Sequence, residues 1–357
     1  MAGWPGALTA LLGIAHPIVQ APMAGFSTPA LAAAVSNAGG LGSLGSAMLE
    51  PEQLRAGLRE LRAATNRPCN ANFFVHAPPS ADAARRARMA ARLRPYYEEL
   101  GVALPEGPLV LPPPFSEAAL EVVLEERPAV VSFHYGLPAA AQMAALRQAG
   151  IQVLSSATTV EEARWLADQG VAAVIAQGYE AGGHRGTFQS PLEAARIGTM
   201  ALVPQVVDAV ACPVIAAGGI MDGRGIAAAL MLGAAGVQLG TAFLGCPEAA
   251  VSPLHRAALK SSGAGGTRVT RAFTGRPARV LANRYALEMA DAEDDALAFP
   301  LQRALSAPLA QAAAARGSAD FMALYAGQGA PLARELAAAE LLETLVAETE
   351  QALARQR

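Results

Sequence analysis

The chain reads Val-Ala-Ala-Val-Ile-Ala over residues 171–176 and continues as Gln-Gly-Tyr-Glu-Ala-Gly-Gly-His-Arg-Gly over residues 177–186. The first run has the length and the Val/Ile content of a buried strand. The second run holds four glycines in ten residues, and glycine lets a backbone approach a ligand with its N–H groups free. His184 in this loop can exchange a proton near neutral pH. The loop is therefore our candidate for the reactive site, and the rest of the chain is expected to be its scaffold.

The same alternation of short apolar runs and amphipathic helical stretches recurs along the chain and predicts βα units around a parallel sheet. Eight strands are predicted, at residues 18–22, 42–45, 70–74, 130–134, 152–155, 173–177, 214–217 and 236–239. Helices are predicted at residues 29–37, 51–64, 81–100, 116–126, 138–148, 159–168, 199–209 and 223–232. The proline cluster at residues 112–114 is predicted to be a stiff connection between units.

Eight βα units fit a TIM (β/α)8 barrel of about 250 residues, and a doubly wound open sheet is the rival architecture. The barrel is favoured because most runs end in glycine or polar residues on their carboxyl side, and because no G-x-G-x-x-G follows the first strand. We expect an α/β TIM barrel over residues 1–246, closed by a C-terminal helix at residues 331–357. Residues 247–330 break the βα rhythm and are expected to form an appended, mainly helical segment over the barrel mouth.

Composition excludes several classes of protein. The 357 residues carry a net charge of −3, which gives no electrostatic case for binding nucleic acid or an anionic membrane. The three cysteines are far apart and form no CxxC pair, which argues against a disulfide framework or a zinc ribbon. No Lys or Arg precedes Arg55, and no apolar run reaches the ~18 residues of a membrane helix. We expect a soluble, cytoplasmic protein.

Two glycine turns follow the seventh and eighth predicted strands, at residues 216–220 and 238–241. In TIM barrels the loops after these strands often bind phosphate through backbone N–H groups. Neither turn holds Lys or Arg, so amides and a hydroxyl would hold the phosphate; ordinary tight turns are the alternative. A phosphate site beside an apolar barrel mouth indicates a phosphorylated cofactor or sugar.

Amide and apolar side chains end other strands. Asn72 and Gln177 offer a donor and an acceptor to a heteroaromatic edge, or they satisfy the backbone of their own loops. Pro22 and Met23 present an apolar surface for a flat ring, although methionine is more often core filler.

Three histidines, His76, His134 and His184, stand at or just after predicted strand ends, which raises the possibility of a catalytic zinc site. The chain offers no His-x-His on a strand and no acid at the end of the seventh or eighth strand, so no metal site is predicted. A Schiff-base aldolase needs a lysine inside the barrel, and the one lysine, Lys260, lies beyond the last strand. His184 has the best case for acid–base chemistry, and His134 either lines the pocket or packs.

Several stretches together resemble the flavin-dependent nitronate monooxygenases of class I, formerly called 2-nitropropane dioxygenases. The specific ones are Gly-Tyr-Glu-Ala-Gly-Gly-His-Arg-Gly and Ser-Phe-His-Tyr-Gly, at residues 178–186 and 132–136. The others lie at residues 20–25, 38–42, 70–74, 216–220, 238–241 and 325–328. The resemblance spans nearly the whole chain, and its clearest departure is Tyr325, where a tryptophan is expected.

The resemblance implies a TIM barrel that binds FMN non-covalently and oxidises alkyl nitronates, typically propionate 3-nitronate, with O2 to carbonyl compounds and nitrite. It implies that His184 is the catalytic residue, which orients the nitronate or takes a proton from a neutral nitroalkane, and His134 is expected at the substrate. The residues expected to bind the cofactor are Pro22, Met23, Ala24, Asn72, Gln177, Gly182, Gly183, Gly218, Gly219, Gln238, Leu239, Gly240, Thr241, Tyr325, Gly327 and Gln328.

Two other functions remain open at this point. The first is an NAD(P)H-dependent FMN reductase of the same superfamily, an enoyl or quinone reductase, and the second is a flavin-free, phosphate-binding barrel lyase. Arg276 and Arg279 are candidates for binding a substrate carboxylate or for packing the appended segment, and packing is favoured. The expected partners are a nitronate or nitroalkane and O2, and the sequence is compatible with a homodimer.

Overall fold

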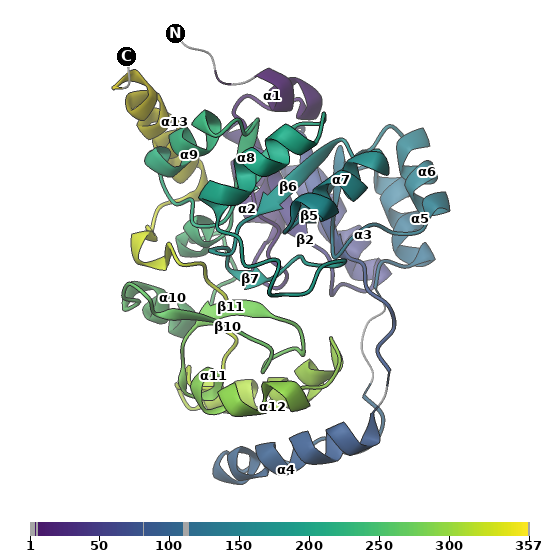
Figure 1. Cartoon of the computed structure of the whole chain (residues 1–357), viewed down its shortest axis with the longest axis vertical. Coiled ribbons are helices and arrows are strands. Elements are labelled where there is room, and N and C mark those ends of the chain that lie inside the picture. Colours follow the sequence, from purple (N-terminus) through teal and green to yellow (C-terminus); the bar gives the residue numbers. More distant parts are fainter. Residues whose placement is uncertain (1–3, 5, 81, 110–113, 356–357) are drawn as a thin grey trace.

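A closed barrel of eight parallel strands forms the centre of the molecule (Figure 1). The computed structural model describes residue 4 and residues 6–80, 82–109 and 114–355, so Val110, Leu111 and two prolines of the predicted stiff connection, Pro112 and Pro113, lie outside the described residues. The barrel strands are β1 Ile18–Gln20, β2 Gly42–Gly45, β3 Cys69–Phe74, β4 Val130–His134, β5 Gln152–Ala157, β6 Ala173–Gln177, β8 Val214–Ala217 and β9 Gly236–Leu239.

The barrel closes between its first two strands. Each strand pairs in parallel with its neighbour in the order β1-β9-β8-β6-β5-β4-β3-β2. A parallel bridge joins Val19 of β1 to Leu41 just before β2, where Leu41 N–H donates to Ile18 O at 2.9 Å. This confirms the predicted α/β barrel and all eight predicted strands; β1 ends at Gln20 rather than residue 22, and β5 extends to Ala157.

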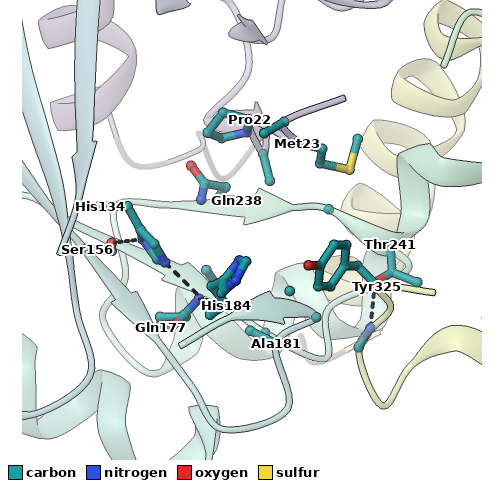
Figure 2. A pocket seen from close by; sticks show the side chains of 18 of the residues that line it. Pro22, Met23, His134, Ser156, Gln177, Ala181, His184, Gln238, Thr241 and Tyr325 are labelled. Carbon is teal, nitrogen blue, oxygen red and sulfur yellow. Dashed lines mark hydrogen bonds between the residues drawn. The ribbon is translucent and has the colours of Figure 1, made fainter. Parts of the chain in front are cut away.

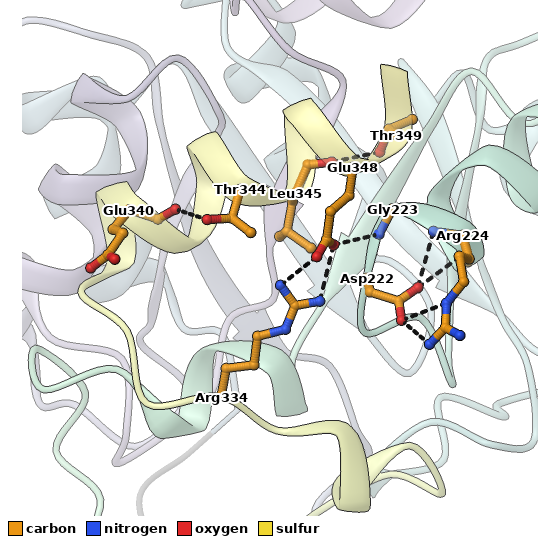
Figure 3. Close-up of polar contacts among 10 residues, drawn as sticks. Asp222, Gly223, Arg224, Arg334, Glu340, Thr344, Leu345, Glu348 and Thr349 are labelled. Carbon is orange, nitrogen blue, oxygen red and sulfur yellow. Dashed lines mark hydrogen bonds and ion pairs between the residues drawn. The ribbon is translucent and has the colours of Figure 1, made fainter. Parts of the chain in front are cut away.

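Helices surround the barrel, and α13 takes the eighth position between α9 and α2. The described helices that follow the strands are α2 Pro29–Asn37, α3 Pro51–Ala64, α4 Ala83–Glu99, α5 Glu117–Glu126, α6 Ala140–Gln148, α7 Val160–Asp168, α8 Thr199–Ala209, α9 Gly223–Met231 and α13 Ala338–Ala354. Glu348 of α13 fixes this closure, because its carboxylate accepts from Gly223 N–H at 3.1 Å and pairs with Arg334 at 2.8 Å (Figure 3).

A short helix, α1 Gly6–Leu12, covers the amino end of the barrel, opposite the end that carries β7 (Figure 1). Leu8 and Leu12 are buried in one cluster with Val130 and Ala173, the first residues of β4 and β6. The apolar segment near the N-terminus therefore completes the core. No helix in the described part of the chain is long and apolar enough to cross a membrane.

A second hydrophobic core lies beyond the carboxyl end of the barrel. It joins α4, an excursion between β3 and α5, to buried side chains of residues 272–321. The 3-10 helices η1 Thr241–Gly245 and η3 Ala330–Leu332 and the helix α10 Pro253–Lys260 flank that stretch in the sequence. The stretch itself includes α11 Arg284–Glu288, the 3-10 helix η2 Ala290–Asp295 and α12 Leu301–Ala315. Met89 and Leu93 of α4 are buried against it, and Tyr97 Oη donates to Leu305 O at 2.6 Å. Figure 1 shows α4 at the end of the molecule that also carries α11 and α12.

The appended segment also contains strands that were not predicted. β10 Thr267–Thr270 and β11 Ala278–Leu281 form an antiparallel pair, and β11 pairs with β7 Gly183–His184 of the glycine loop. The appended segment is therefore helical in the main and carries one antiparallel strand pair that the sequence analysis did not predict. The small sheet β10-β11-β7 ties the appended segment directly to the loop that carries His184.

Candidate active site

A deep cavity opens at the carboxyl end of the barrel strands. The empty space there is about 1320 Å³, with open solvent at the mouth included. This is the end at which a TIM barrel carries its functional loops. The structure brings most of the predicted site residues to its wall: Pro22, Met23, Ala24, Asn72, His134, Gln177, Gly182, Gly183, His184, Gly218, Gly219, Gln238, Gly240, Thr241, Tyr325 and Gly327.

Two predicted residues lie beside the cavity and do not line it. Leu239 is 1% exposed and packs in the barrel core. Gln328 is tied by its backbone, whose N–H donates to Glu180 O at 2.9 Å. Both residues support neighbours that do face the cavity, Gly240 and Gly327.

His184 projects from β7 into the cavity (Figure 2). Its Nε2 lies 2.8 Å from Thr274 Oγ1. Thr274 Oγ1 also donates to Arg276 O at 3.3 Å and accepts from Arg276 N–H at 3.4 Å. The arrangement that satisfies all three contacts has His184 Nε2–H donating to Thr274, which leaves Nδ1 as a proton acceptor. Aromatic rings surround the imidazole with centroids between 5.4 and 6.3 Å away: Phe74, Tyr135, Phe299 and Tyr325.

The carbonyl of His184 is held by two side chains from the barrel (Figure 2). Gln177 Nε2 donates to it at 3.0 Å, while Gln177 Oε1 accepts from Gly186 N–H at 2.8 Å. His134 Nε2 contacts the same carbonyl at 3.2 Å, so this nitrogen must carry the proton, and His134 Nδ1 accepts from Ser156 Oγ. Both ring nitrogens of His134 therefore have partners within the protein. The Gln177 amide binds the backbone of its own loop, which is the second of the two roles that the sequence analysis offered for it.

Other polar groups at the wall keep hydrogen-bonding capacity. Asn72 Nδ2 donates to Ser132 O and Ser132 Oγ at 3.1 and 3.0 Å, which fixes its side chain. Gln238 Oε1 is buried and has no hydrogen-bond partner among the described residues. A buried acceptor without a partner costs about 1–3 kcal/mol, so an N–H donor of a bound molecule would stabilise this position.

The glycine turns supply free backbone donors at one side of the cavity. Gly218 and Gly219 have φ of +117° and +72°, which only glycine adopts without strain. The N–H groups of Gly182, Gly219 and Thr241 donate no hydrogen bond to the part of the chain that the structure describes. Thr241 Oγ1 accepts from Gly327 N–H at 2.9 Å, so its own proton is left to donate. Several unpaired N–H groups and a hydroxyl form a suitable site for a phosphate.

Arg185, the residue after His184, holds the glycine loop together from inside. Its side chain is buried, and the guanidinium donates to the carbonyls of Gly178, Gln177 and Ala195 at 2.6, 3.0 and 3.1 Å. Arg279 is also buried and donates to Tyr179 O at 2.8 Å. Arg276 lies 3.6 Å from the centroid of the Tyr135 ring and donates to Thr187 O. Arg185 and Arg279 thus pack the loop, and packing is confirmed for Arg279.

Burial keeps both cavity imidazoles neutral. It lowers the pKa of His184 to about 3, and the neighbouring His134 ring and the charges of Arg276 and Arg303 add to this effect. Burial also lowers the pKa of His134 to about 3, against a weaker opposing effect of its hydrogen bond to the His184 carbonyl. Both residues keep some exposure to the cavity, so the desolvation comes from surrounding protein atoms. His184 is therefore a free base at neutral pH.

Comparison with known proteins decides the family. Residues 6–348 match the family model described as Nitronate monooxygenase. The chain is 50% identical over 352 residues to Nitronate monooxygenase of Pseudomonas aeruginosa, covering 95% of this chain and 98% of that protein. The chain belongs to the nitronate monooxygenase family. It is therefore an enzyme of a family that is typically flavin-dependent, and the resemblance noted in the sequence is confirmed.

Solved structures agree with this membership of the nitronate monooxygenase family. Nitroalkane oxidase from Streptomyces ansochromogenes is 44% identical, with a TM-score of 0.91 over 98% of this chain and 100% of that chain. FabK from Thermotoga maritima is 32% identical, with a TM-score of 0.78 over 98% of this chain and 97% of that chain. The architecture is thus shared with a second type of protein.

Sequence reasoning missed several residues of this family member's site. Thr274, Phe299 and Arg303 come from the appended segment, and Ser156 comes from the end of β5. These residues can be recognised only from contacts between parts of the chain that are far apart in sequence. Thr274, for example, is 90 residues from His184, which it contacts. Within the described residues, no group of three or more His, Cys, Asp or Glu side chains is placed to hold a metal ion.

Because His134 and His184 are neutral in the folded protein, we expect its free energy of unfolding to depend on pH. His134 and His184 have a pKa of about 3 when folded, against 6.5 for an unperturbed imidazole. Below pH 6.5 the unfolded chain binds protons there that the folded chain does not, so the free energy of unfolding falls as the pH falls towards 3.

Urea unfolding at a series of pH values below 6.5 measures this slope, and the matched variant is His134→Gln. The variant is expected to show a shallower fall of the unfolding free energy with acid, because it lacks one imidazole with a lowered pKa. Equal slopes in the two proteins would show that His134 does not contribute.

Proposed function

We propose that this protein oxidises alkyl nitronates of the propionate 3-nitronate type with O2, giving carbonyl compounds and nitrite, with FMN as its cofactor. The observation that carries the proposal is a neutral His184 held in the wall of a cavity that also offers unpaired backbone N–H groups. Membership of the nitronate monooxygenase family over residues 6–348 supports the reaction class.

The donors and acceptors of the cavity fit FMN. The N–H groups of Gly182, Gly219 and Thr241 would hold the phosphate. The unpaired Gln238 Oε1 would accept from an N–H of the ring, and Pro22 with Met23 would lie against the ring. When bound, FMN supplies the electron transfer and the oxygen chemistry, and the protein supplies placement and charge.

The chain's own residues then bind, orient and deprotonate the substrate. His184 Nδ1 accepts the proton from the carbon of a neutral nitroalkane, or the imidazole orients a nitronate that is already an anion. Thr274 fixes the tautomer, and Gln177 with His134 fixes the backbone. The rings of Phe74, Phe299 and Tyr325 exclude water around this base, which is what lowers its pKa.

Purified protein with FMN tests the proposal. We expect the visible absorption of a bound flavin, loss of that absorption on anaerobic mixing with propionate 3-nitronate, and release of nitrite in air. A colourless protein that binds no added FMN would overturn the proposal and would favour a flavin-free barrel lyase.

The similarity to FabK from Thermotoga maritima favours a second candidate, an NAD(P)H-dependent FMN reductase such as an enoyl or quinone reductase. The discriminating measurement is anaerobic mixing with NADH or NADPH. Rapid bleaching by either nucleotide, without bleaching by a nitronate, would assign the reductase function in place of the oxidation of nitronates.

We also propose that the chain is divided into a barrel and a covering segment. Residues 1–246 with 331–357 would form the FMN-binding barrel, and residues 247–330 would cover its mouth. The separate hydrophobic core of α4 and residues 272–321 supports this division, with α4 joining the covering part. A homodimer remains compatible with it.

A further inference from the structure

Arg303 is the one permanent charge among the described residues that line the cavity. The other ionisable side chains of this wall are His134, His184 and Tyr325. Burial lowers the pKa of both imidazoles to about 3 and raises the pKa of Tyr325 to about 12, so these three groups are neutral at pH 7. No Asp, Glu or Lys of the described ranges lines the cavity. The electrostatic character of the site therefore depends on a single guanidinium.

This guanidinium has no acidic partner in the described part of the chain. No carboxylate there lies within 4.0 Å of Arg303, and α12, which carries it, contains no Asp or Glu. Three of the four acids of the neighbouring η2 are paired elsewhere: Asp291 with Arg92, Asp295 with Arg88, and Glu293 with Arg268. The fourth, Asp294, forms no ion pair with Arg303. The arginines that pack the catalytic loop donate to carbonyls, whereas Arg303 keeps its donors.

Arg303 also lies close enough to the reactive residue to act on the same ligand. Its charge helps to lower the pKa of His184 and partly opposes the rise that burial causes in the pKa of Tyr325. The ring centroids of these two residues are 5.5 Å apart. Arg303 itself is exposed, so it stands at the solvent side of the cavity. A ligand that reaches from His184 toward solvent would meet a planar cation that binds carboxylates through paired N–H groups.

We propose that Arg303 binds a second anionic group of the substrate, so that the enzyme selects nitronates that carry a carboxylate at the end remote from the nitronate. This inference rests on the proposed function and adds to it the residue that would determine the preference for a carboxylated nitronate. A plain alkyl nitronate leaves the guanidinium in water, whereas a carboxylated one replaces that water with a charge-assisted pair. The preference is thus a property of the appended segment and not of the barrel.

The test compares two nitronates of equal carbon number, propionate 3-nitronate and propyl-1-nitronate, in the FMN-loaded protein. Arg303→Gln keeps a polar side chain without the charge, Arg303→Lys keeps the charge without the fork, and Arg164→Gln removes an exposed charge from α7 outside the cavity. Arg303→Gln is expected to raise KM for propionate 3-nitronate about tenfold and to change kcat little. The change in KM for propyl-1-nitronate is expected to stay below about threefold.

Two further readouts separate binding from turnover. Calorimetric titration with succinate, an unreactive dicarboxylate, is expected to show weaker binding to Arg303→Gln than to the wild-type protein, with recovery in Arg303→Lys. Added salt is expected to raise KM for propionate 3-nitronate in the wild-type protein, and to do so less in Arg303→Gln, because an exposed pair is screened.

Equal effects of Arg303→Gln on both nitronates, or the same loss in Arg164→Gln, would overturn the assignment. Failure of the proposed function has a different signature, because the wild-type protein would then oxidise neither nitronate. Succinate binding that depends on Arg303 would still support the anion site in that case.

Discussion

Replacing His184 with asparagine is expected to leave FMN bound and to slow the oxidation of neutral nitroalkanes by about 100-fold to 10,000-fold, the range for loss of a general base. Asparagine keeps a polar group of similar reach but cannot accept a proton at neutral pH. Nitronates are already deprotonated, so their oxidation should lose only the orienting contact, about tenfold. Steady-state kinetics with nitroethane and with ethyl nitronate would measure the two losses separately.

The two substrates make this experiment specific for the base. A structural role alone would reduce both rates by a similar factor and would lower the flavin content of the purified variant. Thr274→Val is the matched control, because it removes the hydroxyl that fixes the His184 tautomer and leaves the imidazole in place. It is expected to reduce the nitroalkane rate less than His184→Asn does. Unchanged kinetics of His184→Asn on both substrates would remove His184 from its role.

The barrel was predictable because its signals are local. Each strand is a short apolar run, and each run is followed by an amphipathic helix with its own start and stop residues, as at Ser116, whose Oγ accepts from Ala119 N–H in the structure. The loop chemistry was visible as well, since glycines and a histidine directly after a buried strand are typical of a functional loop in an α/β enzyme. The eight strands and the rim that carries His184 follow from these patterns alone.

The rest of the site depends on contacts between distant parts of the chain. The sequence around Thr274 has no periodicity that marks it as a partner of His184, because the two meet only through the β7–β11 pairing. Arg185 follows His184 in a polar stretch of sequence and resembles a surface residue. In the structure it is buried, and its guanidinium donates to three backbone carbonyls. The packing of α4 against α12 likewise depends on tertiary contacts. The amphipathic pattern of α4 would fit a helix on the outside of the barrel equally well.

Substituting Gly182 with alanine is expected to reduce the affinity for FMN at least about 100-fold, because the loop wall cannot accommodate one added methyl group. A Cβ at this position would lie 2.5 Å from both Ala326 C and Gly327 N. These are backbone atoms of the segment that lines the opposite side, so relief requires the two loops to separate. The loops are tied by Gln328 N–H to Glu180 O at 2.9 Å, and Gly182 N–H is one of the donors proposed for the phosphate.

The adjacent residue provides the control for this prediction. In Gly183→Ala the new Cβ would meet nothing within 4 Å, although the φ of +73° makes it strained. That strain costs about 1–2 kcal/mol of stability and does not move the facing loop, so Gly183→Ala should retain flavin while its melting temperature falls. Titration of the flavin-free proteins with FMN, followed by flavin fluorescence, gives the two dissociation constants. If Gly182→Ala binds FMN as tightly as Gly183→Ala, the close approach of residues 182 and 326–327 is not what shapes the cofactor site.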